Sequence, residues 1–357
     1  MEKHHIGHRF KFHQLFSFCK QVPLAMTTQS IVGKLKQKIF AHIETMRLYT
    51  VIWCGLVSLV GASLAYGNIP PLKIAFLAFV IPMMGWIAAL YLSDVLDRKL
   101  DAIEKPHRPI PSGRIKTKEA LGVGAIYVIV GFLLCFLLSF WNVLLVFVVA
   151  LLVFAYTKIF KSRGIFGNIN RGIVIIAAYV FGVFATGIQP VSIPVSIWLF
   201  SIVFLIHDIT SNLVGTIRDR EGDQKGGYNT IPVKYGVKAS FIIAACLSIL
   251  YILLIIGFIV FSSLILYLDR FIIVFSCAII ILCIMYLRMF AAQKIDRARA
   301  LQAHEFFVAE RVTLASAFLF GVISSWWVAV LIFVVSLCVS LFTQQMLRKR
   351  YEFMVKL

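Results

Sequence analysis

Apolar residues occur along this chain in long uninterrupted stretches instead of alternating with polar residues. Most stretches are about 20 residues long, which is the length an α-helix needs to cross the hydrocarbon core of a bilayer. The pattern predicts membrane-spanning helices over residues 48–66, 70–92, 119–138, 141–157, 171–188, 193–212, 239–261 and 268–287.

The last apolar stretch, residues 306–345, is too long for a single span. It predicts either one span with an interfacial segment before it, or a hairpin that turns near Ser324–Trp327. The expected fold is therefore all-α, a polytopic membrane bundle of about nine or ten transmembrane helices around a central cavity. We expect one transmembrane domain over residues 46–345, preceded by a basic extension (1–45) and followed by a basic tail (346–357).

Composition agrees with a lipid environment, because 61% of the 357 residues are hydrophobic and only 14% are charged. The formal net charge of +19 does not indicate nucleic-acid binding, since no basic helix with base-stacking aromatic residues lies outside the predicted spans. The seven cysteines are scattered and form no C-x-x-C pair, so we interpret them as small hydrophobic residues.

The basic residues are concentrated in every second connection between the predicted spans. The basic connections lie within residues 98–118, 158–163, 218–238 and 288–299. The alternate connections are nearly free of Lys and Arg and lie near residues 67–70, 139–142, 188–194 and 262–270. By the positive-inside rule, the amino terminus and the basic loops face the cytoplasm, with a bacterial cytoplasmic membrane as the default expectation. The basic tail favours an even number of spans, and hence ten.

The amino-terminal extension contains a short amphipathic pattern. Residues 1–25 are basic and rich in histidine, and a more ordinary amino-terminal sequence begins at Met26. Beyond it, Ile31, Leu35, Ile39 and Ile43 recur at four-residue spacing with lysines between them. This spacing predicts a helix that lies on the membrane surface or, equally, a solvated helix.

Two acidic clusters follow the second and sixth predicted spans. Asp94, Asp97 and Asp101 share one face of a continued helix, and Asp219 and Asp223 are four residues apart. Either cluster alone is typical of a solvated interfacial surface. Two clusters on the same predicted side of the membrane, both surrounded by Lys and Arg, instead indicate a metal–diphosphate site. Ligand sets made only of oxygen atoms favour Mg²⁺.

Three segments that carry these residues resemble, in order, signatures of the UbiA superfamily of intramembrane prenyltransferases. Residues 93–115, SDVLDRKLDAIEKPHRPIPSGRI, are similar to N-D-x-x-D-x-x-x-D followed by K-P-x-R-P-I-P-S-G. Residues 156–168, YTKIFKSRGIFGN, are similar to Y-S-x-x-x-K…G-N. Residues 218–236, RDREGDQKGGYNTIPVKYG, are similar to D-x-x-x-D followed by a lysine, a glycine and T-x-P-V-x-x-G. The resemblance covers residues 45–290.

The resemblance implies that a prenyl group is transferred from a prenyl diphosphate inside the membrane. Asp94, Asp97 and Asp101 would bind one Mg²⁺, and Asp219 and Asp223 the other. Asp97, Asp101, Asp219 and Asp223 would thereby act in catalysis, together with Tyr156, whose aromatic face would stabilise an allylic cation. The implied diphosphate contacts are Arg47, Lys105, Arg108, Lys161, Arg163 and Lys225. For Arg47 and Tyr156, the alternative is an ordinary interfacial anchor.

Ser93 stands where the family usually has Asn, and Thr216 where many members have a further Asp. These two differences concern the fine geometry of the site and the assignment to a subfamily, and not the class of reaction. A polar group late in the sixth span should face a cavity or another helix. The candidates for acceptor binding are the residues of this group and the asparagine of the G-N motif: His207, Asp208, Asn212 and Asn168. The alternative for the group in the span is a hydrogen-bonded polar cluster at the interface.

The expected partners are a prenyl diphosphate, membrane lipids and a small acceptor, for which an aromatic molecule is the first expectation. Two alternatives use the same ionisation: a terpene cyclase, which captures the cation internally, and a transferase with a polar-lipid or sugar-phosphate acceptor. A transporter is disfavoured because the acidic residues lie at loop ends and not at the bilayer midplane. The sequence leaves the prenyl chain length and the oligomeric state open.

Overall fold

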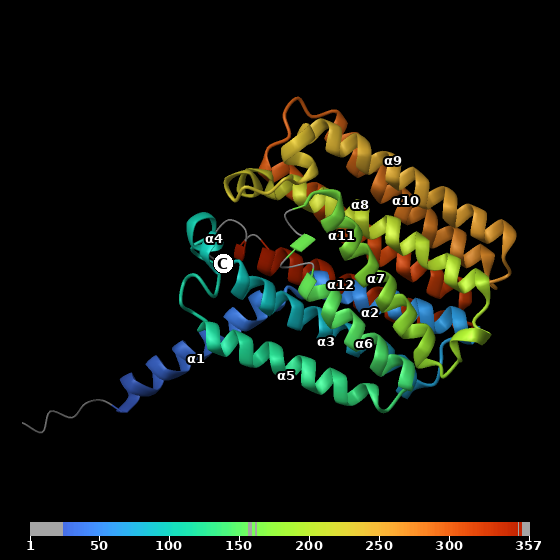
Figure 1. The fold of residues 1–357 in the computed structure, drawn as a ribbon, viewed down its shortest axis with the longest axis horizontal. Helices are drawn as coiled ribbons and strands as arrows, with labels where there is room; N and C mark the ends of the chain where they lie inside the picture. Colours follow the sequence, from blue (N-terminus) through green and yellow to red (C-terminus); the bar gives the residue numbers. More distant parts are fainter. Residues whose placement is uncertain (1–23, 156–158, 161–162, 349, 352–357) are drawn as a thin grey trace, which may run out of the picture.

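The computed structural model describes residues 24–155, 159–160, 163–348 and 350–351. Within these ranges the chain forms helices and short loops, with no β-strand (Figure 1), which confirms the all-α prediction. The helices are α1 (Leu24–Met46), α2 (Leu48–Tyr66), α3 (Leu72–Leu96), α4 (Arg98–Glu104), α5 (Thr117–Cys135), α6 (Phe140–Ala155), α7 (Ile165–Ala185), α8 (Val195–Lys225), α9 (Ile231–Phe261), α10 (Leu268–Phe290), α11 (Arg297–Val322) and α12 (Trp326–Thr343).

Eight helical segments are long and apolar enough to cross a membrane: α2, α3, α5, α7, α8, α9, α10 and a segment from α12 to Arg348. Two further helices complete the bundle: α6, a largely apolar helix of 16 residues, and α11, which contains several charged residues. α11 and α12 are separated only by Ile323–Ser325, so the hairpin prediction is confirmed. The described residues thus contribute ten helices to the bundle, the larger of the two expected numbers.

Helix α11 lies at the centre and packs against α2, α8, α10 and α12. Its buried surface includes two charged side chains, Glu310 and Arg311. Charged groups at such depth require polar partners. Glu310 accepts from Tyr251 (3.1 Å) and lies 2.8 Å from a ring nitrogen of His207, and Arg311 donates to the carbonyl oxygen of Tyr49 (2.9 Å). The centre of the bundle is therefore held together by polar contacts as well as by apolar packing.

Helices α2 and α7 approach each other closely at two glycines. A Cβ atom added at Gly182 would lie 1.7 Å from the carbonyl oxygen of Ser58, and one added at Gly61 would lie 2.2 Å from that of Tyr179. Small residues allow such close backbone contact between membrane helices. This crossing fixes the position of α2, which begins beside the acidic cluster of α3, relative to α7, which carries Arg171.

Replacing Gly182 with valine should destabilise the protein strongly, because the added side chain cannot fit without separating α2 from α7. We expect a loss of at least about 2 kcal/mol, as for overpacking of a tightly packed core. Thermal unfolding in detergent measures the effect. Gly257, which has open space around its Cβ position, provides the matched control. An unchanged midpoint for Gly182→Val would contradict this description of the crossing.

Helix α1 extends away from the bundle (Figure 1). Leu35 and Ile39 are 56% and 52% exposed, as a surface-lying helix requires, although the interfacial position itself stays a prediction. Between α1 and α2, Arg47 adopts a left-handed conformation (φ 46°, ψ 53°). A non-glycine residue in this region carries backbone strain and is found mainly where function requires it. The turn directs Arg47 toward Asp94 on α3.

Candidate active site

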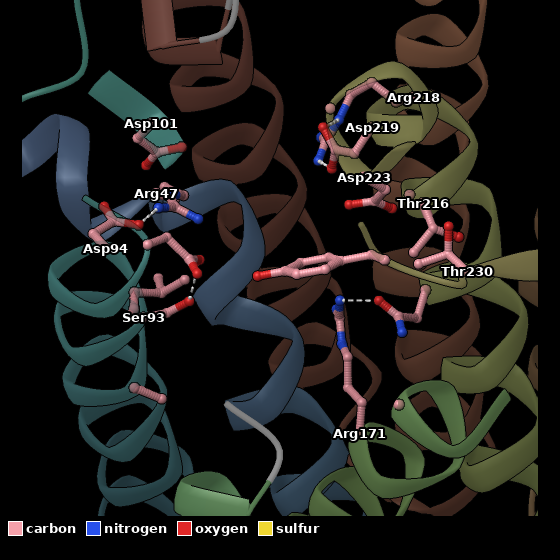
Figure 2. Close-up of a pocket in the computed structure, with 18 of the residues that line it drawn as sticks. Arg47, Ser93, Asp94, Asp101, Arg171, Thr216, Arg218, Asp219, Asp223 and Thr230 are labelled. Atoms are coloured by element: carbon pink, nitrogen blue, oxygen red, sulfur yellow. Dashed lines mark hydrogen bonds and ion pairs between the residues drawn. The ribbon is translucent and has the colours of Figure 1, made fainter. Parts of the chain in front are cut away.

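A polar cavity of about 270 Å³ lies between the carboxyl-terminal end of α3, helix α4 and the last turns of α8 (Figure 2). Helix α7 contributes one wall. All five predicted metal-binding aspartates line the cavity, together with three of the predicted diphosphate-binding residues: Asp94, Asp97, Asp101, Asp219, Asp223, Arg47, Lys105 and Arg108.

The first acidic cluster is built on two nearly continuous helices. α3 ends at Leu96, Asp97 forms the junction, and α4 begins at Arg98. The backbone N–H of Asp97 donates to Ser93 (2.8 Å), and that of Asp101 donates to Asp97 (2.9 Å), so the helical spacing persists across the junction. Asp94, Asp97 and Asp101 therefore keep the predicted shared face, although the helix is interrupted at Asp97. The second cluster lies on the last two turns of α8, as the sequence predicts.

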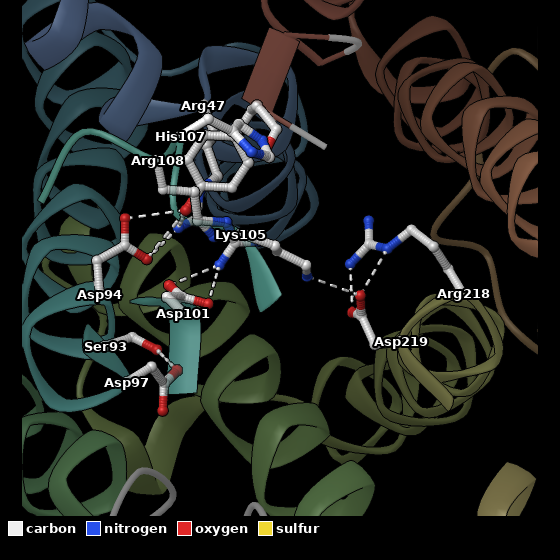
Figure 3. Close-up of polar contacts among 11 residues, drawn as sticks. Arg47, Ser93, Asp94, Asp97, Asp101, Lys105, His107, Arg108, Arg218 and Asp219 are labelled. Carbon is white, nitrogen blue, oxygen red and sulfur yellow. Dashed lines mark hydrogen bonds and ion pairs between the residues drawn. The ribbon is translucent and has the colours of Figure 1, made fainter. Parts of the chain in front are cut away.

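Each cluster is neutralised by cations (Figure 3). Arg47 pairs with Asp94, and one nitrogen of Arg108 donates to both carboxylate oxygens of Asp101 (2.9 Å each).

Lys105 joins the two clusters across the cavity. Its Nζ atom lies 3.2 Å from Asp219, whose other oxygen accepts from Arg218 at 2.5 Å. A metal–diphosphate complex could exchange these pairs, because its cation would attract the carboxylates and its oxygens would attract the Lys and Arg side chains.

Asp101 lies on α4, outside the membrane-spanning helices, and its surroundings change its pKa. Burial raises the pKa of Asp101 above its ordinary value, while the Arg108 guanidinium acts in the opposite direction. Ionisation of this carboxyl therefore costs more free energy than ionisation of an aspartate in water. A cation brought next to Asp101 would lower that pKa, because it would bind the ionised carboxylate more tightly than the protonated form.

Tyr351, from the predicted basic tail, is part of the same ionic cluster. Its ring lies between two guanidinium groups, 4.3 Å from that of Arg47 and 4.2 Å from that of Arg108. Its hydroxyl donates to the carboxylate of Asp94 (3.0 and 3.2 Å), and the side chain is only 1% exposed. Burial raises the pKa of Tyr351 well above its ordinary value, so the hydroxyl stays protonated and remains a donor.

The tail is attached to the bundle by further contacts. A ring nitrogen of His107 lies 3.0 Å from the carbonyl oxygen of Tyr351, and Arg350 lies 3.4 Å from the buried carboxylate of Glu44. Arg348 is fully buried and donates to His304 (2.6 Å). Residues 344–348 and 350–351 therefore pack against one side of the site.

A second polar group lies on the α7 side of the cavity. Arg171 donates to Asn212 (2.7 Å), which in turn donates to Asn168 (2.8 Å). Behind them, Asp208 pairs with Arg171 (3.2 Å) and accepts from Trp53 (3.2 Å). Two of the predicted acceptor-binding residues, Asn168 and Asn212, line the cavity.

The structure does not bring every predicted residue to the cavity. His207 and Asp208 are fully buried behind the wall and contact Glu310 and Arg171, so they can influence an acceptor only through other side chains. Arg163 and Lys225 are exposed and do not line the cavity. Tyr156 and Lys161 lie outside the described residues.

Several cavity residues were not predicted from the sequence. An arginine at the beginning of an apolar span is itself a signal for function, and Arg171 could have been identified in this way. Trp86 and His304 also line the cavity but lie in no motif, and Tyr228 lies within the second signature at a position that the signature does not specify. Nothing in the local sequence around Tyr351 distinguishes it from a solvated tail residue.

An apolar cavity of about 340 Å³ adjoins the polar one. Its walls come mainly from α3, α5, α6 and α7. Four residues line both cavities and form the neck between them: Trp86, Ala89, Val153 and Val174. A molecule with a charged head and a long hydrocarbon chain could thus place each part in a matching environment.

The donor set of the polar cavity suits Mg²⁺. The five aspartates offer only oxygen ligands, which this hard cation prefers. Among the described residues, no three acidic, histidine or cysteine side chains lie close enough to hold a metal ion by themselves. Mg²⁺ fits such a site, because it is usually bound by one or two carboxylates and completes its shell with water and substrate phosphates.

Known proteins are similar to this chain in sequence or in fold. Digeranylgeranylglyceryl phosphate synthase from Pyrococcus horikoshii is 30% identical over 213 residues, which cover 60% of this chain and 75% of the relative. A solved UbiA homologue from Aeropyrum pernix matches 75% of this chain and 96% of its own (15% identity, TM-score 0.62). Another, from Archaeoglobus fulgidus bound to DMAPP and Mg²⁺, matches 85% of this chain and 99% of its own (14% identity, TM-score 0.50).

The solved structures share the fold of an integral, multi-pass membrane protein with this chain. The sequence profile of the UbiA prenyltransferase family matches residues 53–310, which include both acidic clusters and the helices that carry them. The chain belongs to the UbiA prenyltransferase family.

Proposed function

We propose that this protein transfers a prenyl group from a prenyl diphosphate to a glycerophosphate lipid within the membrane, with Mg²⁺ as its metal. The observation that carries the proposal is the junction of a cation-rich acidic cavity with an apolar cavity at a shared neck. The diphosphate fits the first and the prenyl chain the second, so that the carbon–oxygen bond to be broken lies at the neck.

The side chains of the polar cavity would bind and orient the diphosphate. Arg47, Lys105 and Arg108 would leave their aspartate partners and contact phosphate oxygens, while the aspartates hold the metal. Mg²⁺, when bound, would neutralise charge on the diphosphate and make pyrophosphate a better leaving group. The same basic loops favour an orientation with this site toward the cytoplasm.

The transfer step requires that water be kept from the reacting carbon. The bond between C1 of the prenyl group and the diphosphate oxygen breaks, and its electron pair leaves with pyrophosphate. The acceptor hydroxyl oxygen then bonds to C1 and loses its proton to pyrophosphate or solvent at the polar end. Trp86, Ala89, Val153 and Val174 enclose the neck with largely apolar surface, which limits hydrolysis of the cationic carbon.

The choice of acceptor rests on the relatives. The Pyrococcus horikoshii relative is named as a synthase of digeranylgeranylglyceryl phosphate. This lipid contains a glycerol phosphate with two geranylgeranyl groups. Its formation by prenyl transfer needs geranylgeranyl diphosphate and geranylgeranylglyceryl phosphate. We propose acceptors of this class for the present chain, and the aromatic acceptor expected from the sequence is the alternative that the same assay tests.

The test is an assay of purified protein with geranylgeranyl diphosphate and a panel of acceptors, including the glycerophosphate lipid and small phenols. With Mg²⁺ we expect a product that combines donor and glycerophosphate lipid. Chelation of the metal should lower pyrophosphate release by at least about 100-fold, because charge on the leaving group is no longer neutralised.

Each other outcome selects a different function. An adduct with a phenol alone would replace the proposed acceptor by an aromatic one. Pyrophosphate release with a cyclic terpene and no adduct would indicate a cyclase. Absence of pyrophosphate release with prenyl diphosphates of several chain lengths would refute the transferase proposal.

A further inference from the structure

Arg171 is the one described guanidinium group that reaches the polar cavity from the α7 side. In Figure 2 its side chain extends from α7 into the space between the two acidic clusters. It lines the cavity, and its side chain is 21% exposed. An arginine inside a membrane bundle is costly, and it is normally found where it binds a partner or a substrate.

The surroundings of Arg171 fix the direction of its guanidinium group. Asp208, which is fully buried, pairs with Nε from behind (3.2 Å) and is itself held by the indole N–H of Trp53. Asn212 accepts from Nη1 at 2.7 Å, and the indole ring of Trp86 lies 5.2 Å from the guanidinium carbon. A group supported on three sides in this way is preorganised for binding.

One edge of the guanidinium remains for a ligand. Among the described residues, no hydrogen-bond partner faces the Nη2 atom of Arg171. Asn168, which accepts from Asn212, also lines the cavity and keeps the Asn212 amide oriented toward Arg171. Guanidinium edges bind phosphate through paired, charge-assisted hydrogen bonds.

The position of Arg171 distinguishes its ligand from the donor diphosphate. The donor's phosphates have their own cations near the acidic clusters: Arg47, Lys105, Arg108 and Arg218. Arg171 lies instead over Trp86, one of the residues of the neck, where the reacting carbon is expected. An anion bound by Arg171 would hold the molecule that carries it within reach of that carbon.

We propose that Arg171, positioned by Asp208 and Asn212, binds the phosphate head group of the acceptor and so selects phosphorylated acceptors. This inference rests on the proposed prenyl transfer and assigns its acceptor subsite. Asp208 is a positioning residue here, because it contacts Arg171 and not the cavity.

The experiment compares Arg171→Lys with the double variant Arg171→Gln/Asp208→Asn, which avoids leaving Asp208 buried without a partner. The probes are geranylgeranylglyceryl phosphate and the same lipid without phosphate. For the phosphorylated lipid, we expect KM to rise about 10-fold in Arg171→Lys and about 100-fold in the double variant. The KM for geranylgeranyl diphosphate should stay within about twofold in both variants, since its phosphates bind elsewhere.

The matched control is Arg270→Gln at the opposite end of the bundle, where Arg270 donates to the carbonyl oxygen of Ser324 (3.1 Å). It should leave both KM values unchanged. The wild-type protein should prefer the phosphorylated lipid, and the double variant should lose most of that preference.

The outcomes separate this inference from the proposed function. If the wild-type protein uses the phosphorylated lipid and folded Arg171 variants keep the wild-type KM for it, the subsite assignment is wrong and the transferase stands. A parallel rise in KM for the donor and for both lipids would also overturn it, because it would indicate general damage to the cavity. If the wild-type protein transfers prenyl groups only to neutral acceptors, the phosphate subsite is refuted together with the proposed acceptor.

Discussion

Asp219→Asn should lower prenyl transfer by at least about 1,000-fold while leaving the protein folded. Asp219 connects the two halves of the polar cavity, because its carboxylate lies 3.2 Å from Lys105 of the α4 side and 2.5 Å from Arg218 of its own helix. Asparagine has nearly the same size but no charge, so it can neither hold a divalent cation in the proposed manner nor balance these two cations. The measurement is the rate of pyrophosphate release at saturating Mg²⁺ and donor, together with the unfolding midpoint.

Asp269→Asn is the matched control, because Asp269 is exposed in the first turn of α10, away from the cavity. It should retain wild-type activity. Asp97→Asn should behave like Asp219→Asn. Wild-type turnover by either folded cavity variant would show that the acidic clusters do not hold the catalytic metal.

Tyr351→Ala should weaken the binding of prenyl diphosphate by about 10- to 100-fold. The ring contacts the guanidinium groups of both Arg47 and Arg108, and the hydroxyl donates to Asp94. Each cation–π contact is worth about 0.5–2 kcal/mol, so loss of both releases two proposed diphosphate ligands from their fixed positions. The dissociation constant of a non-hydrolysable prenyl diphosphate analogue measures this effect directly.

Tyr351→Phe separates the ring from the hydroxyl. It keeps both cation–π contacts and removes only the hydrogen bonds of the hydroxyl, which donates to Asp94 and accepts from Arg47, so its effect should be about tenfold or less. Tighter donor binding by Tyr351→Ala than by the wild-type protein would reverse the interpretation, since it would mean that the ring competes with the substrate for the two arginines.

The sequence was sufficient to predict the bundle and many of the residues that line the candidate site. Long apolar stretches predicted the spans, and a hairpin that turns near Ser324–Trp327 was one of the two alternatives for the last stretch. Helical spacing placed Asp94, Asp97 and Asp101 on one face, which the structure retains across the α3–α4 junction. These features depend on local periodicity, which a single sequence records directly.

Contacts between distant segments could not be predicted in the same way. Tyr351 lies 257 positions after Asp94, and its neighbours in the sequence are charged, so periodicity gives no sign that it is buried. His207 and Asp208 were recognised as polar groups within a span, but whether they face the cavity or α11 depends on the rotation of α8 in the bundle. The rotation is set by packing among ten helices and not by the α8 sequence.

The central position of α11 also has a consequence for biosynthesis. His207 on α8 contacts Glu310 of α11, which follows 103 positions later in the chain. At a synthesis rate of about 5–20 residues per second, α8 must wait roughly 5–20 s for this partner. During that interval the earlier helices lack α11, which packs at the centre of the finished bundle. The polar side chains of His207 and Tyr251 then lack their partner Glu310. We therefore expect the nascent chain to remain shielded by the insertion machinery until α11 arrives, and its release into lipid to follow the entry of that helix.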